Sequence, residues 1–248
     1  MANPYLLLWL EAPLQSWGFD SKFGRRETLK FPTRSGVVGL VCSALGAGGE
    51  QRELLAEFAS LKQTVISFVR SRQTGDEKRK LEREPLLRDF HMVGSGYDDR
   101  DPWMSLMIPK TISGGKSVGG GTKRGGTKMT YRFYLQDAFF AVILEALPQR
   151  AGELAEALRN PVWDLYLGRK NCVPTDFIYR GTFETQEEAE KSAHDIATKK
   201  NLIEDFRVLD GVDDMDACDE VMTLNDVPVQ FGMDKRYRDR RVGVRYAG

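Results

Sequence analysis

A run of cations with no opposing carboxylate lies in the middle of the chain, at residues 110–132. The run reads KTISGGKSVGGGTKRGGTKMTYR, and no Asp or Glu lies between Asp101 and Asp137. Because its other residues are mostly Gly, Ser and Thr, it buries little apolar surface to offset its ordering entropy. It is interpreted either as a solvated loop or as a flexible arm that holds a polyanion without sequence preference. The cations that would act collectively in such an arm are Lys110, Lys116, Lys123, Arg124 and Lys128.

Arg34 marks a second candidate anion site. Thr33 or Ser35 can cap a helix that begins here, and the N-terminus of a helix carries a partial positive charge. A cation beside that charge predicts a phosphate site. The structural alternative is an ordinary capped core helix, with Arg34 in a surface ion pair with Glu11 or Glu27.

Two further groups of residues have side chains suited to a polyanion. Trp17 is followed by a glycine, and its indole can stack on a splayed base, although a tryptophan in this setting more often packs in a core. Arg25 and Arg26 lie in the loop that follows and extend a possible groove. Arg169 and Lys170 are adjacent cations in a predicted turn and form the next candidate phosphate site.

The totals describe an ordinary globular chain of 248 residues, with 41% hydrophobic and 29% charged residues and a formal net charge of +0. The overall charge therefore predicts no nucleic-acid partner, and only the uneven distribution of cations does. Cys42, Cys172 and Cys218 lack the spacing of zinc ligands, which favours free thiols in a reducing cytoplasm. No apolar run reaches the length of a membrane span, and no cofactor-binding motif is present.

The apolar patterns predict an antiparallel α+β sheet of ferredoxin-like type. Strand-like flanks on both sides of the basic run predict a long hairpin that projects from the body. The acidic helix is expected to be solvated, and residues 70–80 are charged without apolar periodicity. Strands are expected at residues 4–10, 64–69, 86–93, 131–144, 206–209, 221–224, 227–231 and 235–246, the last at an edge, and helices from about residue 33 to Gly46 and at residues 50–61, 151–158 and 184–200.

Four blocks of residues occur in a fixed order: APLQSWG at 12–18, FPTRSGVVGL at 31–40, LRDFH at 87–91 and YLGRKNC at 166–172. Together they resemble the CasD family, the fifth-numbered CRISPR-associated proteins of type I-E systems, within the RAMP superfamily. The PTRSG and LGRKNC blocks are fairly specific in combination. The resemblance is weaker through the acidic helix and returns faintly after it.

The resemblance implies one RAMP-type domain, residues 1–248, with a ferredoxin-like (RRM-like) body, a β-hairpin thumb at about residues 70–132 and a β-rich C-terminal extension. It implies a non-catalytic, cytoplasmic subunit of Cascade, the CRISPR surveillance complex, which serves antiviral defence. Such a subunit holds the 5′ handle of the CRISPR RNA and caps the backbone filament. The implied partners are that RNA, the backbone subunits, the large subunit and, through the complex, target DNA, with no cofactor and no membrane.

The resemblance also places Arg88 and His91 at the base of the thumb, near the first guide nucleotides. The C-terminal cations serve either RNA or the large subunit; they are Arg236, Arg238, Arg240 and Arg241. The complete set of expected RNA-binding residues is Trp17, Arg25, Arg26, Arg34, Arg88, His91, Lys110, Lys116, Lys123, Arg124, Lys128, Arg169 and Lys170.

Two other functions remain open at this point. Related subunits of another subtype cut the repeat RNA without a metal, through general acid–base attack of the 2′-hydroxyl. His91 with Tyr97 or Tyr131 and Lys128 can in principle supply those groups. The other function is that of a scaffold that contacts protein only, and the long run without carboxylates argues against it.

Overall fold

The computed structural model describes residues 2–19, 21, 24–74, 77–93, 128–210 and 217–247. Its strands join in one sheet of order β7-β1-β6-β3-β8-β10-β9, to which β2, β4 and β5 attach at their margins. All pairs are antiparallel except β2 with β6. The strands are β1 (Tyr5–Gln15), β2 (Arg25–Arg26), β3 (Gln63–Thr74), β4 (Glu77–Lys80), β5 (Leu87–Val93), β6 (Lys128–Glu145), β7 (Tyr179–Phe183), β8 (Leu202–Asp210), β9 (Glu220–Gln230) and β10 (Arg236–Tyr246). An antiparallel α+β architecture is therefore confirmed.

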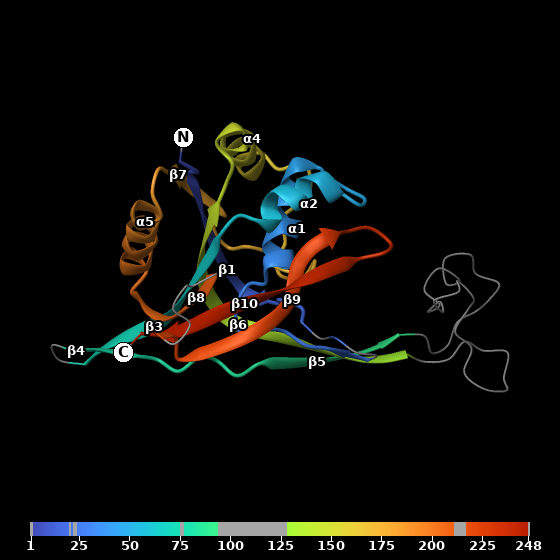
Figure 1. The fold of residues 1–248 in the computed structure, drawn as a ribbon. Coiled ribbons are helices and arrows are strands. Elements are labelled where there is room, and N and C mark those ends of the chain that lie inside the picture. The colour runs from blue at the N-terminus through green and yellow to red at the C-terminus, as the bar shows by residue number, and fades with distance from the viewer. Residues whose placement is uncertain are drawn as a thin grey trace, which may run out of the picture.

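Helices cover both faces of the sheet (Figure 1). Alternation along β1 explains this, because Leu6, Leu8 and Leu10 face one hydrophobic core while Leu7 and Trp9 face another. The first core is closed by three helices and the second by one. The helices are α1 (Arg34–Leu45), α2 (Arg52–Ala59) and α4 (Pro148–Arg159) on the first face, and α5 (Gln186–Lys199) on the second.

The start and end of α1 follow the sequence signals. The Thr33 hydroxyl accepts a hydrogen bond of 3.1 Å from the backbone N–H of Gly36, and Gly46 ends the helix with a left-handed φ of 68°. A Cβ atom at Gly36 would lie 2.8 Å from the indole of Trp17. The absent side chain therefore allows α1 to approach the loop after β1.

The acidic helix α5 is only partly solvated, contrary to the expectation from its composition. Ala189, Ala193 and Ala197 are buried and pack on the sheet beside Leu7 and Trp9. Their spacing of four residues places them on one helical face, and the carboxylates occupy the others. Because alanine is small, these three residues were not recognised in the sequence as the apolar face of the helix, although they form it.

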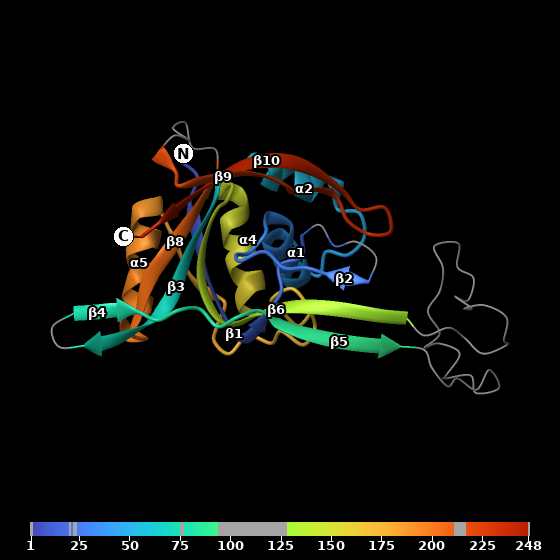
Figure 2. The same cartoon turned by 90° about the horizontal axis from the view of Figure 1, so that it is seen from below.

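β6 is the longest strand of the described residues and lies inside the sheet, between β1 and β3. Its second half pairs with β1 and β3, and its first half pairs with β5 well outside the body (Figure 2). Asp137, between the two halves, has a left-handed φ of 42°, which interrupts the regular pleat there. The expected return strand at residues 131–144 is confirmed, within a longer strand of 18 residues.

The charged stretch at residues 70–80, which lacks apolar periodicity, contains the end of β3 and the strand β4, which pair with each other. One expectation for the strands was wrong. The C-terminal strand is not an edge, since β10 lies between β8 and β9. β9 is the edge instead, and the backbone N–H of Phe231 just after it bonds to Glu50 O at 3.0 Å.

Candidate nucleic-acid interface

Three strands build a surface outside the body of the sheet. β5 pairs with the first half of β6 from Leu87↔Tyr134 to Val93↔Lys128, and β2 pairs with β6 along its other side. Paired residues in adjacent strands point to the same face of a sheet. Arg88, Phe90 and Met92 therefore share one face with their partners on β6. We call this surface the basic-aromatic face; it consists of Arg25, Arg88, Phe90, Met92, Met129, Tyr131 and Phe133.

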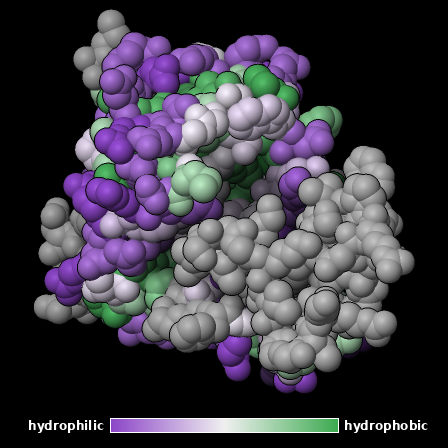
Figure 3. Space-filling model, turned by 90° about the vertical axis from the view of Figure 1, so that its right-hand side faces the viewer, coloured by the Kyte–Doolittle hydropathy of each residue, from purple (hydrophilic) through white to green (hydrophobic). Residues whose placement is uncertain are grey.

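The aromatic rings of this face are open to solvent. Phe90 is 50% and Tyr131 is 40% exposed, and their ring centroids lie 5.3 Å apart. Met92 and Met129 are also exposed beside them. Figure 3 views the molecule from the side toward which these strands project, where hydrophobic and hydrophilic residues intermingle outside the grey area.

Guanidinium groups lie over the rings of the same face. The Cζ atom of Arg25 is 5.2 Å from the ring centroid of Phe133, and that of Arg88 is 5.8 Å from the centroid of Tyr131. Both arginines are exposed, although Arg25 also pairs with Glu27 at 2.7 Å. Alternating rings and cations suit single-stranded nucleic acid, whose bases stack while its phosphates attract the cations.

The opposite face of the same strands carries His91. Its Nε2 atom contacts the carboxylate of Asp89, and Asp89 pairs with Arg132 across the ladder. His91 pairs with Thr130, whereas Tyr131 pairs with Phe90. His91 and Tyr131 therefore point to opposite faces, and the structure does not bring them together.

Arg169 fixes the base of these strands to the body. Its guanidinium donates hydrogen bonds to Phe133 O at 3.2 Å and Arg26 O at 3.0 Å, and it lies 4.6 Å from the ring centroid of Tyr134. Gly168, just before it, has a φ of 103°, and a Cβ atom there would lie 1.7 Å from Ser16 O. The arginine is thus a positioning residue, and the neighbouring Lys170 is exposed.

Arg34 lies inside the protein, which corrects the expected phosphate contact. It is 5% exposed, its Nη2 atom is 3.4 Å from Asp210 Oδ2, and burial lowers the pKa of its guanidinium. The backbone N–H of Arg34 donates to Asp226 at 2.7 Å, so a carboxylate already occupies the helix N-terminus. Arg240 binds the carboxylates of Asp226 and Asp210. It is therefore not available to RNA or the large subunit, contrary to the expectation for the C-terminal cations.

The alternative ion pairs named for Arg34 were wrong too. Glu11 pairs with Lys200 at 2.7 Å, and Glu27 pairs with Arg25. The true partner, Asp210, is on β8. It is too distant in sequence for local spacing to reveal it.

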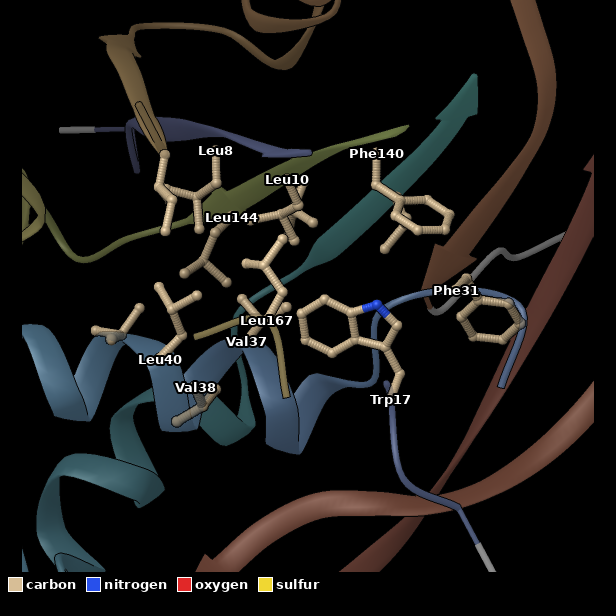
Figure 4. Close-up of a cluster of buried hydrophobic side chains, with 14 of the residues drawn as sticks. Leu8, Leu10, Trp17, Phe31, Val37, Val38, Leu40, Phe140, Leu144 and Leu167 are labelled. Carbon is tan, nitrogen blue, oxygen red and sulfur yellow. The ribbon is translucent and has the colours of Figure 1, made fainter. Parts of the chain in front are cut away.

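Trp17 cannot stack on a base in this structure. It is 1% exposed, and Figure 4 shows its indole among buried hydrophobic side chains that include Phe31 and Leu167. The indole N–H donates to Gln15 Oε1 at 3.1 Å. The packing interpretation of this tryptophan is therefore the correct one.

The remaining expected residues fall outside what can be placed. Lys110, Lys116, Lys123 and Arg124 lie outside the described residues, as does Tyr97. Lys128 begins β6, and its side chain is not among those described. Of the thirteen candidates, seven lie on or beside β2, β5 and β6: Arg25, Arg26, Arg88, His91, Lys128, Arg169 and Lys170.

The aromatic half of the interface escaped the sequence reasoning. Phe90 was not singled out, and Tyr131 was considered only as an acid. The signal that could have found them is the matching alternation of Arg88, Phe90 and Met92 with Met129 and Tyr131. Two such patterns on the flanks of one predicted hairpin place their side chains on one face.

Metal and membrane sites are not evident in the described part of the chain. No group of three or more His, Cys, Asp or Glu side chains there is arranged to hold a metal ion. Within the same residues no helix has the length and apolar character needed to cross a membrane.

Burial raises the pKa of the Cys42 thiol to about 11, which keeps this thiol protonated at neutral pH.

Comparison with known proteins identifies the family. Residues 5–244 match the family described as CRISPR-associated protein (Cas_Cas5). The chain is 32% identical over 186 residues to the CRISPR system Cascade subunit CasD of Escherichia coli strain K12, covering 74% of this chain and 73% of that protein. A chain of a CRISPR RNA-guided surveillance complex superimposes with a TM-score of 0.66 at 26% identity, over 98% of this chain and 90% of that one. A crystal structure of a Cas protein gives 0.58 at 25% identity, over 98% and 94%. The chain therefore belongs to the Cas5 family of CRISPR-associated proteins.

Proposed function

We propose that this protein is a non-catalytic RNA-binding subunit of a type I-E Cascade complex. The basic-aromatic face carries the proposal, because it offers Phe90 and Tyr131 to bases and Arg25 and Arg88 to phosphates. The CasD relative is named as a Cascade subunit, and one structural neighbour is part of an RNA-guided complex. Shared family and suitable chemistry point to the same ligand.

The ferredoxin-like interpretation is supported by the connection of the first strands. The chain runs β1, α1 and α2, β3, β6, α4, β7, and the spatial order of the four strands is β7-β1-β6-β3. The helices between them lie on one face of the sheet. This order supports the split βαβ arrangement of the ferredoxin-like fold, and β5 with the first half of β6 would be the thumb of a single domain.

In this proposal the subunit holds the 5′ handle of a CRISPR RNA in the cytoplasm and caps the backbone filament. The thumb would lie over the RNA next to the first backbone subunit. The large subunit would dock nearby, and target DNA would be met through the complex. Phosphate contacts position an RNA without reading its sequence, which suits a part that binds every guide of one system.

Repeat-RNA cleavage is the competing activity, and one observation favours it. Asp89 holds the His91 imidazole by a side-chain contact, as an orienting carboxylate would. The separation of His91 and Tyr131 onto opposite faces weighs against it, since a 2′-hydroxyl attack needs an acid and a base around one phosphate. We therefore assign Asp89 and His91 a structural role in the thumb, and RNA cleavage is one outcome of the test below.

The test compares Arg25→Ala/Arg88→Ala with Arg159→Ala. Arg159 is a matched control because it also lies over a ring, 4.7 Å from the centroid of Tyr179, but on α4. A labelled single-stranded RNA of mixed sequence is titrated at several salt concentrations. Log affinity falls as log salt concentration rises, and each lost phosphate contact should make this slope less steep by about 0.7. The double variant should show that change, and the control should keep the wild-type slope.

A second arm offers CRISPR repeat RNA to the wild type without metal. Intact RNA together with the slope change supports the proposal. Equal slopes in all three proteins would refute the interface. Site-specific cutting that disappears in His91→Ala would replace the proposal with an endoribonuclease.

A further inference from the structure

A second polar site lies between the loop after β1 and the C-terminal hairpin β9/β10. It is a groove of about 730 Å³, within the range of about 300–1,000 Å³ that is usual for ligand sites. One wall comes from the start of α1 and the loop before β2, and the other from β9 and β10. The lining residues used below are Arg26, Ser35, Asn225, Asp226, Lys235, Tyr237 and Asp239.

The groove is next to the basic-aromatic face and is separated from it by β2. Arg25 lies over Phe133 on that face, whereas Arg26 lines the groove. Side chains of consecutive strand residues point in opposite directions, so this two-residue strand presents one cation to each site. A single-stranded RNA that crosses β2 from the basic-aromatic face would therefore meet the groove at Arg26.

The groove contains an aromatic ring with polar groups around it. Tyr237 is half-buried, and burial raises the pKa of its phenol. The amide of Asn225 donates to Asp239 Oδ1 at 2.6 Å, and its carbonyl oxygen can accept a hydrogen bond. The Ser35 hydroxyl, which donates to Thr33 Oγ1 at 3.4 Å, adds an acceptor. A ring with amide and hydroxyl groups matches a nucleobase, which has a π-face and a polar edge.

Charge sets the orientation of such a ligand. Two carboxylates, Asp226 and Asp239, also line the groove. Asp226 is buried and ion-paired with Arg240, whereas Asp239 is exposed, so a phosphate beside Asp239 would be repelled. Arg26 and Lys235 are exposed and can hold a phosphate at the rim. The arrangement therefore favours a base inside and its phosphate outside.

We infer that this groove binds one unstacked nucleotide of the single-stranded RNA that follows the basic-aromatic face. The inference rests on the proposed function and adds a second contact point to it. Tyr237 stacks on the base, and Arg26 and Lys235 bind the adjoining phosphates. The base is held at its edge by Asn225 and Ser35.

The test uses the full-length chain and a labelled single-stranded RNA of mixed sequence. Tyr237→Ala should weaken binding about tenfold, as loss of a base–aromatic stack does, with an unchanged salt slope. Tyr237→Phe keeps the ring and should bind nearly as the wild type. Arg26→Ala/Lys235→Ala should weaken binding and lower the slope. Thermal unfolding of each variant confirms that it is folded.

The design separates this inference from the proposed function. If Arg25→Ala/Arg88→Ala loses affinity but Tyr237→Ala and Arg26→Ala/Lys235→Ala do not, the groove inference fails and the proposed function stands. If no variant loses affinity, both fail. A Tyr237→Ala protein that binds RNA normally but no longer associates with another Cascade subunit makes the groove a protein contact, which overturns the inference. Crosslinking of a 4-thiouridine RNA to the β10 peptide that contains Tyr237 supports it.

Discussion

Two hydrogen bonds, of 2.6 and 2.9 Å, join the guanidinium of Arg240 to the carboxylate of Asp226. Arg240 lies on β10 and Asp226 on β9, and Asp226 also accepts from the first residue of α1. Arg240 reaches Asp210 on β8 as well. This buried network ties the C-terminal strands to the N-terminal half of the chain.

Removing the cation of this network should be costly. Arg240→Ala leaves the carboxylates of Asp226 and Asp210 buried without that partner, so the free energy of unfolding should fall by about 3–5 kcal/mol. Urea unfolding followed by circular dichroism measures it. Arg241→Ala, at the exposed neighbouring position, should change stability by less than about 0.5 kcal/mol. Similar losses in both variants would show that the network is not what stabilises this region.

A second ionic cluster predicts a dependence of stability on pH. Burial alone would raise the pKa of Glu204, but hydrogen bonds from His194 and Arg207 lower it to about 2 from its usual 4.5. A carboxyl with a depressed pKa stabilises the fold above its unfolded value and loses that contribution as the pH falls. Stability should therefore decline from pH 4.5 toward pH 2, by on the order of 3 kcal/mol from this group.

The matched variant for that measurement is Glu204→Gln, compared with the wild type by urea unfolding across the acidic range. It should lack the part of the decline due to this carboxyl. The hydrogen bond to Glu204 also raises the pKa of His194. Its stabilisation should be complete below about pH 6.5 and lost as the pH rises through the elevated value. Identical acid profiles for the two proteins would contradict the assignment.

Gly168 should not tolerate any side chain. Its φ is 103°, and an added Cβ would lie 1.7 Å from the backbone oxygen of Ser16. Gly168→Ala should therefore destabilise the protein by several kcal/mol and displace Arg169. Gly152→Ala is the control, because Gly152 lies in α4 with open space around it and alanine there should stabilise by about 0.5–1 kcal/mol. Equal melting temperatures for the two variants would disprove the close approach.

Phe90→Ala should weaken RNA binding with little effect on stability. The ring is half-exposed, so its loss removes a stacking surface worth roughly 1–3 kcal/mol per base and little core. The salt slope should not change, because no cation is removed. Phe177→Ala is the matched control at a ring that is 82% exposed elsewhere. Fluorescence anisotropy distinguishes them, and an equal effect of the two would refute a specific role for Phe90.

Local signals predicted most elements of this fold. Thr33 and Gly46 delimit α1 because caps act within one turn, and the apolar runs of β1 and β6 mark two buried interior strands of the sheet. The interior position of β10 was missed. Its pairing with β9 is a hairpin, but its pairing with β8 joins strands that are not consecutive in the chain, which neither propensity nor periodicity records.

The candidate site was predicted less well than the fold. A cation near a helix N-terminus has the same sequence signature whether a phosphate or a protein carboxylate meets it, and here Asp226 and Asp210 meet Arg34 and its helix. Arg25 and Arg88 could be named from composition. Their proximity to Tyr131 and Phe133 follows only from strand register.

β6 runs without a break from the basic-aromatic face to the middle of the core. The projecting half of β6 is thus continuous with a second half that is held by hydrogen bonds between β1 and β3. Both halves belong to one continuous strand, in which Asp137 has a left-handed φ. The direction in which β5 and the first half of β6 project is therefore set by the folded core. A force on these projecting strands is transmitted to the hydrogen bonds that β6 makes with β1 and β3.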